Sequence, residues 1–268
     1  MAPGLPRIKS RDSARDGLNI GRDSGRNSSL NSSALIRCLI DRAIVNAADV
    51  AQMAAETDVK QSFAEELGLW LDWTDAIALS AALGTGAALQ APGIQLGTPS
   101  PATTVIAEFK RVRADLAQAI RADVGFETEA PDQSAADFSP YRRSYRAHQQ
   151  AMETRIGVLR AQVRAVLSGL SAELKRIAAL DAVLDKALAA KERHLLSTVP
   201  SLLEKHFKRL GAGGGATPEA RLGPSQSPVW LAVFFGDMQA ALLAELDFRL
   251  HAVDGMVDAM PTLPTRQS

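Results

Sequence analysis

The stretch that decides the fold is YRRSYRAHQQAMETRIGVLRAQVRAVLSGL, residues 141–170, followed by SAELKRIAALDAVLDKALAAKERHLL, residues 171–196. Apolar side chains recur in both halves at steps of three, four and seven residues, which places one apolar stripe on each of two helices. Between the halves, Gly169 can adopt the left-handed conformation that ends a helix, and Ser171 can cap the next one. An arm of about 28 residues is roughly 40 Å long. The stretch therefore predicts a long antiparallel helical hairpin that presents a surface.

The composition favours helices and gives no sign of metal or disulfide chemistry. Hydrophobic residues make up 46% of the 268 residues and aromatic residues only 5%, which is ordinary for a helical globular protein. The 30 basic and 30 acidic residues cancel, so only a local patch can favour nucleic acid. The single cysteine, Cys38, excludes a disulfide framework and a cysteine-based zinc site. No apolar run approaches the roughly 20 residues that span a bilayer, so we expect a cytoplasmic protein.

Helical patterns alternate with segments rich in Gly, Pro, Ser and Thr, so we predict an all-α protein, an elongated helical bundle built around the long antiparallel hairpin. The first segment is too polar to fold alone, and its composition predicts disorder. The predicted order is a basic and polar tail (1–32), an N-terminal helical pair (33–84), a linker (85–104), the hairpin core with its basic arm (105–210), a flexible linker (211–227) and a C-terminal helix packed on the core (228–260).

Within these segments, helix-start and helix-stop residues set finer boundaries. The N-terminal pair is predicted to span Ala34 to about Ala55 and about Val59 to Leu83. The second arm of the hairpin is expected to end near His194. Thr198 and the proline that follows it, Pro200, then predict the start of a separate short helix.

The first arm of the hairpin is the most basic part of the predicted fold, because six arginines face a single acid, Glu153, between residues 140 and 170. Tyr141 and Tyr145 accompany them at helical spacing, which suits phosphate contact combined with base stacking. The same pattern suits a plain helix whose arginines pair with acids on a neighbour, such as the 125–139 loop. The arginines are Arg142, Arg143, Arg146, Arg155, Arg160 and Arg164.

A second basic cluster follows at Lys205, Lys208 and Arg209, where cations also complement the carboxyl end of a helix dipole. If this cluster folds back near Arg142, the two groups form one positive patch. We predict that these nine basic residues make a DNA-binding surface, with helix-to-helix ion pairing as the open alternative.

The C-terminal helix offers the best candidates for contact with a partner protein. Trp230, Phe234 and Phe235 lie on a broad apolar stripe. Such a stripe is either a core face or a face that docks on a partner, and we name these three residues as the predicted docking face.

No motif for catalysis, metal binding or a cofactor occurs in the chain, so we predict no catalytic residue, no metal site and no cofactor. There is no Walker loop, dinucleotide fingerprint or metal-binding histidine pair. Asp72 and Asp75, three residues apart, could suggest a metal site, but an exposed edge, or hydrogen bonding to a neighbouring helix end, explains them better. An unrecognised nuclease that uses these two carboxylates is the enzymatic alternative.

Seven short blocks carry a family resemblance: SFAE (62–65), WLDWTDAI (70–77), YRRSY (141–145), RAQVR (160–164), LDAVL (180–184), TVPSLL (198–203) and LAELD (243–247). Together they resemble a proteobacterial family of unknown function that includes the F component of type III Zorya anti-phage defence systems. The resemblance covers most of residues 34–260, outside the 84–104 and 211–227 segments.

The resemblance implies a cytosolic partner of a proton-driven membrane motor complex that senses infection at the envelope, alone or with a second soluble subunit. Other Zorya types pair this motor with soluble proteins that engage or degrade nucleic acid, so DNA is the implied ligand of the basic arm. A protein–protein adaptor without nucleic acid is the main rival. The sequence leaves the oligomeric state open, a homo-oligomer included.

Overall fold

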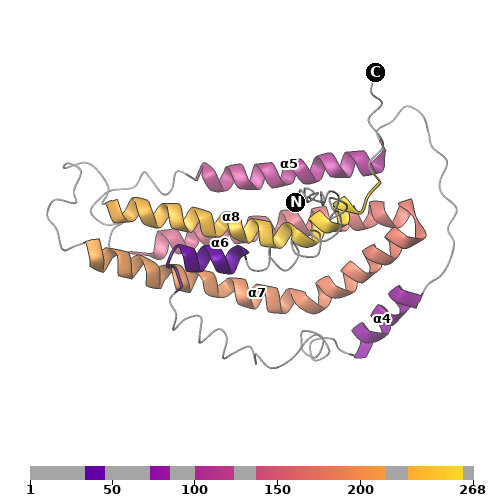
Figure 1. Ribbon diagram of the computed structural model, residues 1–268, viewed down its shortest axis with the longest axis horizontal. Coiled ribbons are helices and arrows are strands. Elements are labelled where there is room, and N and C mark those ends of the chain that lie inside the picture. The colour runs from indigo at the N-terminus through magenta and orange to yellow at the C-terminus, as the bar shows by residue number, and fades with distance from the viewer. Residues whose placement is uncertain (1–33, 46–72, 85–99, 124–136, 215–228, 262–268) are drawn as a thin grey trace, which may run out of the picture.

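The computed structural model describes residues 34–45, 73–84, 100–123, 137–214 and 229–261. Within these ranges every regular element is a helix and no strand occurs, which confirms the predicted all-α fold. The long helices α5 (Pro101–Arg121), α6 (Ser139–Leu170), α7 (Ala172–Gly214) and α8 (Val229–Asp258) run alongside one another in an elongated bundle (Figure 1). The shorter helix α4 (Trp73–Gly84) packs on α7.

Helices α6 and α7 form the predicted hairpin, and Ser171 is the only residue between them. Ser171 has an extended backbone, and its Oγ accepts a hydrogen bond of 3.1 Å from the backbone N–H of Leu174. This is the predicted helix cap. At the other end of α6 the Asp137 carboxylate accepts the backbone N–H of Ser139 at 2.9 Å.

Helix α7 corrects the prediction of a separate helix after His194, because it runs unbroken from Ala172 to Gly214 with Pro200 inside it. Pro200 has no N–H, so the carbonyl of Leu196 loses its usual partner one turn later. The side-chain amide of Gln149 on α6 donates to this carbonyl at 3.0 Å. Thr198 does not act as a cap, since its Oγ1 donates to the carbonyl of Leu195. Packing against α6 therefore lets α7 continue through a proline.

We expect Gln149→Ala to lower the free energy of unfolding by about 1–3 kcal/mol, because the Leu196 carbonyl is left without a donor and the buried Glu245 carboxylate loses one of its donors. Urea denaturation followed by circular dichroism measures the loss, with the exposed neighbour Gln150→Ala as the matched control. Pro200→Ala restores a backbone N–H that can serve the carbonyl. The cost of Gln149→Ala should therefore be smaller in the Pro200→Ala background, and an equal cost in both backgrounds would contradict this account.

The N-terminal segment also departs from prediction. Residues 34–41 are helical, but the helix expected to reach about Ala55 gives way to a turn at 42–45. Ala43 lies in the left-handed region with φ of 51°, a conformation that ends a helix. The carbonyls of Ala43 and Ile44 both accept hydrogen bonds from Arg209 of α7, which fixes the turn on the bundle. Residues 46–72, which include Asp72, lie outside the described ranges.

Both predicted linkers are shorter than expected, because a neighbouring helix extends into each of them. Helix α5 starts at Pro101, inside the predicted 85–104 linker, because proline fits the first turn of a helix. Helix α7 extends through residues 211–214 of the predicted 211–227 linker. A Cβ at Gly211 would lie 3.6 Å from the ring of Trp230, so packing against α8 supports this last turn.

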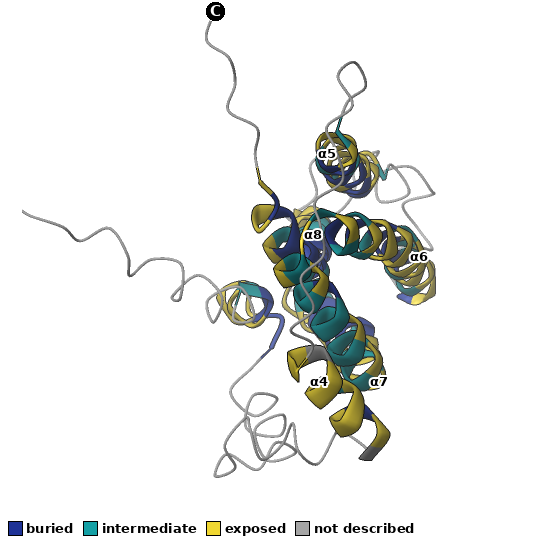
Figure 2. Ribbon diagram, turned by 90° about the vertical axis from the view of Figure 1, so that its right-hand side faces the viewer, coloured by how far each residue is buried: buried dark blue, intermediate teal, exposed yellow. Residues whose placement is uncertain are grey.

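Helix α8 is the central element, since it packs against α5, α6 and α7. Figure 2 shows that buried residues line the inner sides of these helices and exposed residues the outer sides. By length and composition α8 could also cross a membrane. This corrects the expectation that no apolar stretch in the chain is long enough. It is also what a core helix of a bundle looks like, and the cytoplasmic location stays a prediction.

Candidate nucleic-acid interface

Two of the predicted DNA-binding arginines are committed to holding the hairpin together. Arg160 donates to Asp181 at 2.6 Å and to Asp185 at 2.7 Å. Arg164 donates to Asp181 at 2.6 Å and also contacts Asp185. The guanidinium groups are only 15% and 21% exposed. The two pairs join α6 to α7 as a charge-balanced cluster, so these arginines add little positive potential to the surface.

Arg155 is also paired, with Asp115 of α5 at 2.8 Å. The partners of all three arginines therefore come from α5 and α7. These three arginines therefore follow the alternative that was predicted from the sequence, ion pairing with acids on a neighbouring helix. The acids are Asp115, Asp181 and Asp185, and they do not come from the suggested 125–139 loop. An exposed pair such as Arg155–Asp115 contributes only about 0–1 kcal/mol to stability. Its main effect is that Asp115 neutralises the charge of Arg155.

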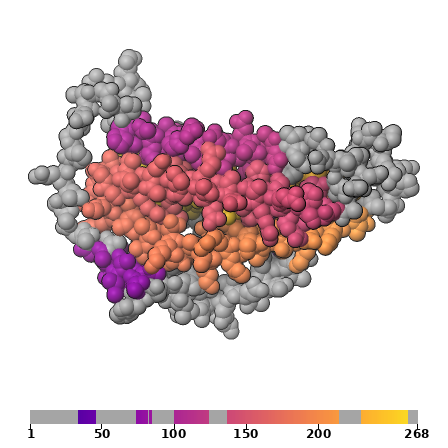
Figure 3. All heavy atoms as spheres, turned by 180° about the vertical axis from the view of Figure 1, so that it is seen from behind, coloured from indigo at the N-terminus to yellow at the C-terminus, as the bar shows by residue number. Residues whose placement is uncertain are grey.

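Two arginines in the first turns of α6 differ from the three paired arginines described above. Arg143 and Arg146 are exposed, and no described residue pairs with either guanidinium. Together with Arg142 and Gln150 they line a shallow groove on the surface of α6. In space-filling view α6 runs exposed across one whole face of the molecule between α5 and α7 (Figure 3). Because the groove lies at the amino end of α6, the helix dipole adds to its positive potential.

Arg142 connects this groove to α7. Its guanidinium lies 5.5 Å from the centre of the Phe138 ring and pairs with Glu204. Lys208 donates to the same carboxylate at 2.9 Å. The bond from Lys208 is the largest cause of a lowered pKa at Glu204, so this carboxylate stays charged between its two partners. The basic cluster of α7 therefore folds back beside Arg142, which sequence reasoning left undecided.

We call this surface the end patch. It holds four cations, two of which contact the Glu204 carboxylate, and Asp137 interacts with Arg142 and Arg143 at its edge. The two remaining residues of the predicted surface lie near it in sequence but differ in their contacts. Lys205 is exposed. Arg209 is bound to the carbonyls of residues 43 and 44 and approaches His206. The end patch consists of Arg142, Arg143, Arg146, Lys208 and Glu204.

The aromatic part of the predicted interface does not reach the surface. Tyr141 is 4% exposed and Tyr145 is fully buried. The Tyr145 hydroxyl donates to Glu245 of α8 at 2.9 Å. Neither ring can stack on a base, which corrects the expectation of stacking between the arginines. The end patch offers phosphate contacts alone.

The predicted docking face on α8 is part of the core. Phe234 is fully buried, and the rings of Trp230 and Phe235 are half-buried against the same core. Phe234 lies 5.1 Å from Phe207 and 5.6 Å from Tyr141, measured between ring centres. The docking prediction is therefore wrong for Phe234, because its entire side chain is used to join α8 to α6 and α7.

The buried histidine–carboxylate pair of the fold has no free group for acid–base work. His206 Nε2 lies 2.8 Å from Asp237 Oδ2, and its Nδ1 faces Arg209 at 3.3 Å. A carboxylate only accepts and a guanidinium only donates, so both ring nitrogens are occupied. Arg42 completes the cluster by donating to Asp237 at 2.9 Å. The cluster anchors the N-terminal turn on α7 and α8.

Asp75 also has a structural partner. Asp75 is 7% exposed, and its carboxylate accepts a hydrogen bond of 2.8 Å from Lys186 of α7. The residue therefore bonds to a neighbouring helix, but to a side chain within that helix and not to a helix end, and it does not lie on an exposed edge. Within the described ranges, no group of three or more His, Cys, Asp or Glu side chains is arranged to hold a metal ion.

A comparison with protein families shows the family to which the chain belongs. The family described as protein of unknown function (DUF3348) matches residues 23–262. The chain belongs to the DUF3348 family. The match runs through both predicted linkers and contains the whole end patch. No curated protein and no solved structure matches the chain.

Proposed function

We propose that this DUF3348 protein is a non-enzymatic helical component of an anti-phage defence assembly that binds DNA through the end patch. The observation that supports this is the pair of exposed arginines, Arg143 and Arg146, with which no described acid forms an ion pair. As the family resemblance implies, the protein would act with a membrane motor complex and a second soluble subunit.

The chemistry of the end patch favours contact with the DNA backbone and not with bases. Arginine forks match phosphate geometry, while the buried tyrosines leave no stacking platform. Binding of this kind is independent of sequence and weakens steeply as salt rises, because each phosphate contact releases counterions. Double-stranded DNA should therefore bind at least as well as single-stranded DNA.

Fluorescence anisotropy with labelled duplex DNA over a range of salt concentrations tests the proposal. We expect Arg143→Ala/Arg146→Ala to weaken binding and to reduce the slope of log K against log salt by about 2, at about 0.9 per phosphate contact. The matched control is Arg37→Ala/Arg121→Ala, which removes two exposed arginines elsewhere on the surface. Arg142 is left in place because it pairs with Glu204 and packs on Phe138.

Three outcomes decide the matter. A loss confined to Arg143→Ala/Arg146→Ala supports the end patch as the DNA contact. An equal loss in the control variant would mean that total charge, and not this patch, governs binding. No binding to double- or single-stranded DNA at low salt, with or without the second soluble subunit, would reject DNA binding and leave the adaptor alternative.

A further inference from the structure

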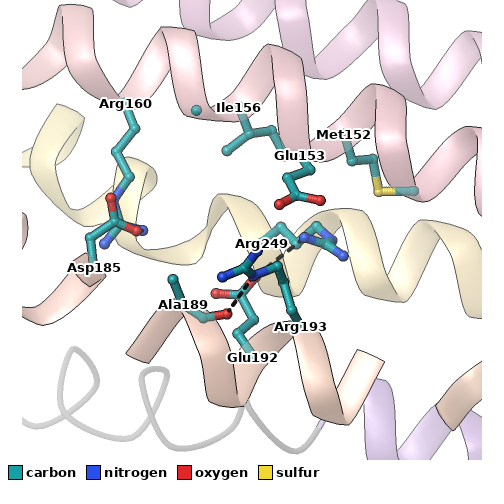
Figure 4. Close-up of a pocket in the computed structure, with 10 residues that line it drawn as sticks. Met152, Glu153, Ile156, Arg160, Asp185, Ala189, Glu192, Arg193 and Arg249 are labelled. Atoms are coloured by element: carbon teal, nitrogen blue, oxygen red, sulfur yellow. Dashed lines mark hydrogen bonds and ion pairs between the residues drawn. The ribbon is translucent and has the colours of Figure 1, made fainter. Parts of the chain in front are cut away.

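A charged pocket of about 180 Å³ opens between α6, α7 and α8, at residues of α6 that follow the end patch along the helix (Figure 4). This volume is larger than one water molecule needs, at about 30 Å³, and smaller than the roughly 300–1,000 Å³ of drug-sized sites. Met152, Ile156 and Ala189 give it an apolar wall. Its charged lining residues are Glu153, Arg160, Asp185, Glu192, Arg193 and Arg249.

Half of these charges are already satisfied by the fold. Arg160 and Asp185 belong to the ion-pair cluster of the hairpin. Arg249 is 8% exposed, and its Nε donates to the buried carboxylate of Glu245 at 2.9 Å. These groups form the fixed frame of the pocket, although Arg249 also makes a long hydrogen bond of 3.5 Å to Glu192 in the same pocket.

The other three charged groups keep capacity for a ligand. Glu153 is exposed on α6, and no described residue pairs with it. The contact of Glu192 with Arg249 is long, at 3.5 Å. Arg193 uses its Nε for the Ala189 carbonyl, at 3.2 Å, which leaves its two terminal nitrogens free of described partners. Figure 4 shows all three side chains around the same opening.

We propose that this pocket binds a small basic amino acid, with its two cationic groups at Glu153 and Glu192 and its carboxylate at Arg193. Two carboxylates and one guanidinium are complementary to two cations and one carboxylate, which is the charge pattern of lysine and arginine. The aliphatic stem of such a ligand would lie on the wall made by Met152 and Ile156. The proposal is independent of DNA binding by the end patch.

The environment of the Glu192 carboxyl group supports the placement of a ligand cation beside it. Burial raises the pKa of its carboxyl group, although Arg249 acts in the opposite direction. A partly buried carboxylate without a close partner is costly. An ammonium or guanidinium group within hydrogen-bonding distance would relieve that cost, so binding energy is available at this position.

Isothermal titration of the full-length protein with lysine tests the proposal, with two analogues as probes. Norleucine lacks the side-chain cation, and cadaverine lacks the carboxylate. We expect lysine to bind best, and norleucine to bind about tenfold or more weakly, since a hydrogen bond to a charged group contributes about 1.5–3 kcal/mol. Arginine should bind in the same range as lysine.

Variants assign the three contacts. Glu192→Gln and Glu153→Gln should each weaken lysine binding about tenfold or more. Arg193→Gln should make lysine bind no better than cadaverine. Glu173→Gln, an exposed carboxylate at the start of α7, is the matched control and should leave binding unchanged. Thermal unfolding confirms that each variant is folded, which is expected because Arg249 keeps its bond to Glu245 in all of them.

The proposal is overturned if neither lysine nor arginine binds at about 10 mM, where even a ligand of millimolar Kd occupies most sites. It is also overturned if norleucine binds as well as lysine, because the charges would then contribute nothing. Lysine binding that survives Glu192→Gln and Glu153→Gln in the folded protein would place the ligand elsewhere.

Discussion

Replacing Glu245 by alanine is expected to lower the free energy of unfolding by about 3–5 kcal/mol, because it removes the carboxylate that neutralises a buried guanidinium. Glu245 is fully buried in the middle of the apolar helix α8. It accepts hydrogen bonds from Arg249 at 2.9 Å, from Tyr145 at 2.9 Å and from Gln149 at 3.0 Å. In Glu245→Ala, Tyr145 loses its acceptor, Gln149 keeps only the Leu196 carbonyl, and Arg249 keeps only its long contact with Glu192. A loss of this size is a large part of the roughly 5–15 kcal/mol that a typical domain has.

Urea denaturation of three variants separates the possible causes. Glu245→Ala leaves Arg249 buried with only its long contact of 3.5 Å to Glu192, whereas Glu245→Met/Arg249→Met removes both charges and keeps the volume. We expect the double variant to be more stable than Glu245→Ala, since the unpaired charge is the main cost. Glu173→Ala is the exposed control and should change stability by less than about 0.5 kcal/mol. A double variant that is no more stable than Glu245→Ala would contradict the account.

The same network sets the protonation state of Tyr145. Burial is the main cause that raises the pKa of its hydroxyl well above the ordinary value, and the Glu245 carboxylate raises it further. The hydroxyl therefore stays a donor at neutral pH. A raised pKa in the folded state means that this hydrogen bond is fully present below the ordinary pKa of tyrosine, about 10. Its contribution is lost only as the pH rises above that value.

The sequence predicted the hairpin well because its information is local. The apolar stripe of α6 is confirmed at Met152, Leu159 and Val163, which are all buried. Ser171 caps α7 as expected. Periodicity and capping act within a few residues, so they can be recognised without knowledge of the neighbouring helices.

Which arginines remain free could not be predicted in the same way, because it depends on the packing register between helices. One local signal was present: Arg160 pairs with Asp185 and Arg164 with Asp181 about one common midpoint, which lies between residues 172 and 173, just after the turn at Ser171. Residues equally distant from the turn of an antiparallel hairpin face each other, so these pairs could have been found. Nothing comparable marked Arg143, whose environment is set by residues far along the chain.

The roles of Glu245 and Pro200 were even harder to predict from local sequence patterns than the pairing of the arginines. A carboxylate within the apolar stripe of α8, with Arg249 one turn later, indicates a buried ion pair. Its further partner Tyr145 lies 100 residues earlier and is invisible to local patterns. Pro200 indicates a helix start by every local rule. Only the amide of Gln149, brought in by tertiary packing, makes a continuous helix acceptable.

Phe234→Ala is expected to be as costly as the loss of Glu245, at about 3–5 kcal/mol, because it empties the centre of the aromatic cluster. Phe234 is fully buried and lies 5.1 Å from Phe207, 5.6 Å from Tyr141 and 6.1 Å from Phe138 between ring centres. These rings come from α7, from α6 and from the residue just before α6. The cavity would therefore weaken the contacts of α8 with both arms of the hairpin at once.

Chemical denaturation together with near-ultraviolet circular dichroism measures both the stability and the packing of these rings. Val233→Ala is the matched control, because Val233 is the preceding residue on α8 and is 48% exposed. Its change should stay within about 0.5 kcal/mol, and Phe234→Leu should fall between the two variants since it leaves a smaller cavity. A residue that served only to dock a partner would give the opposite pattern, with stability unchanged and partner binding lost. Equal small effects of Phe234→Ala and Val233→Ala would therefore restore the docking prediction for this face of α8.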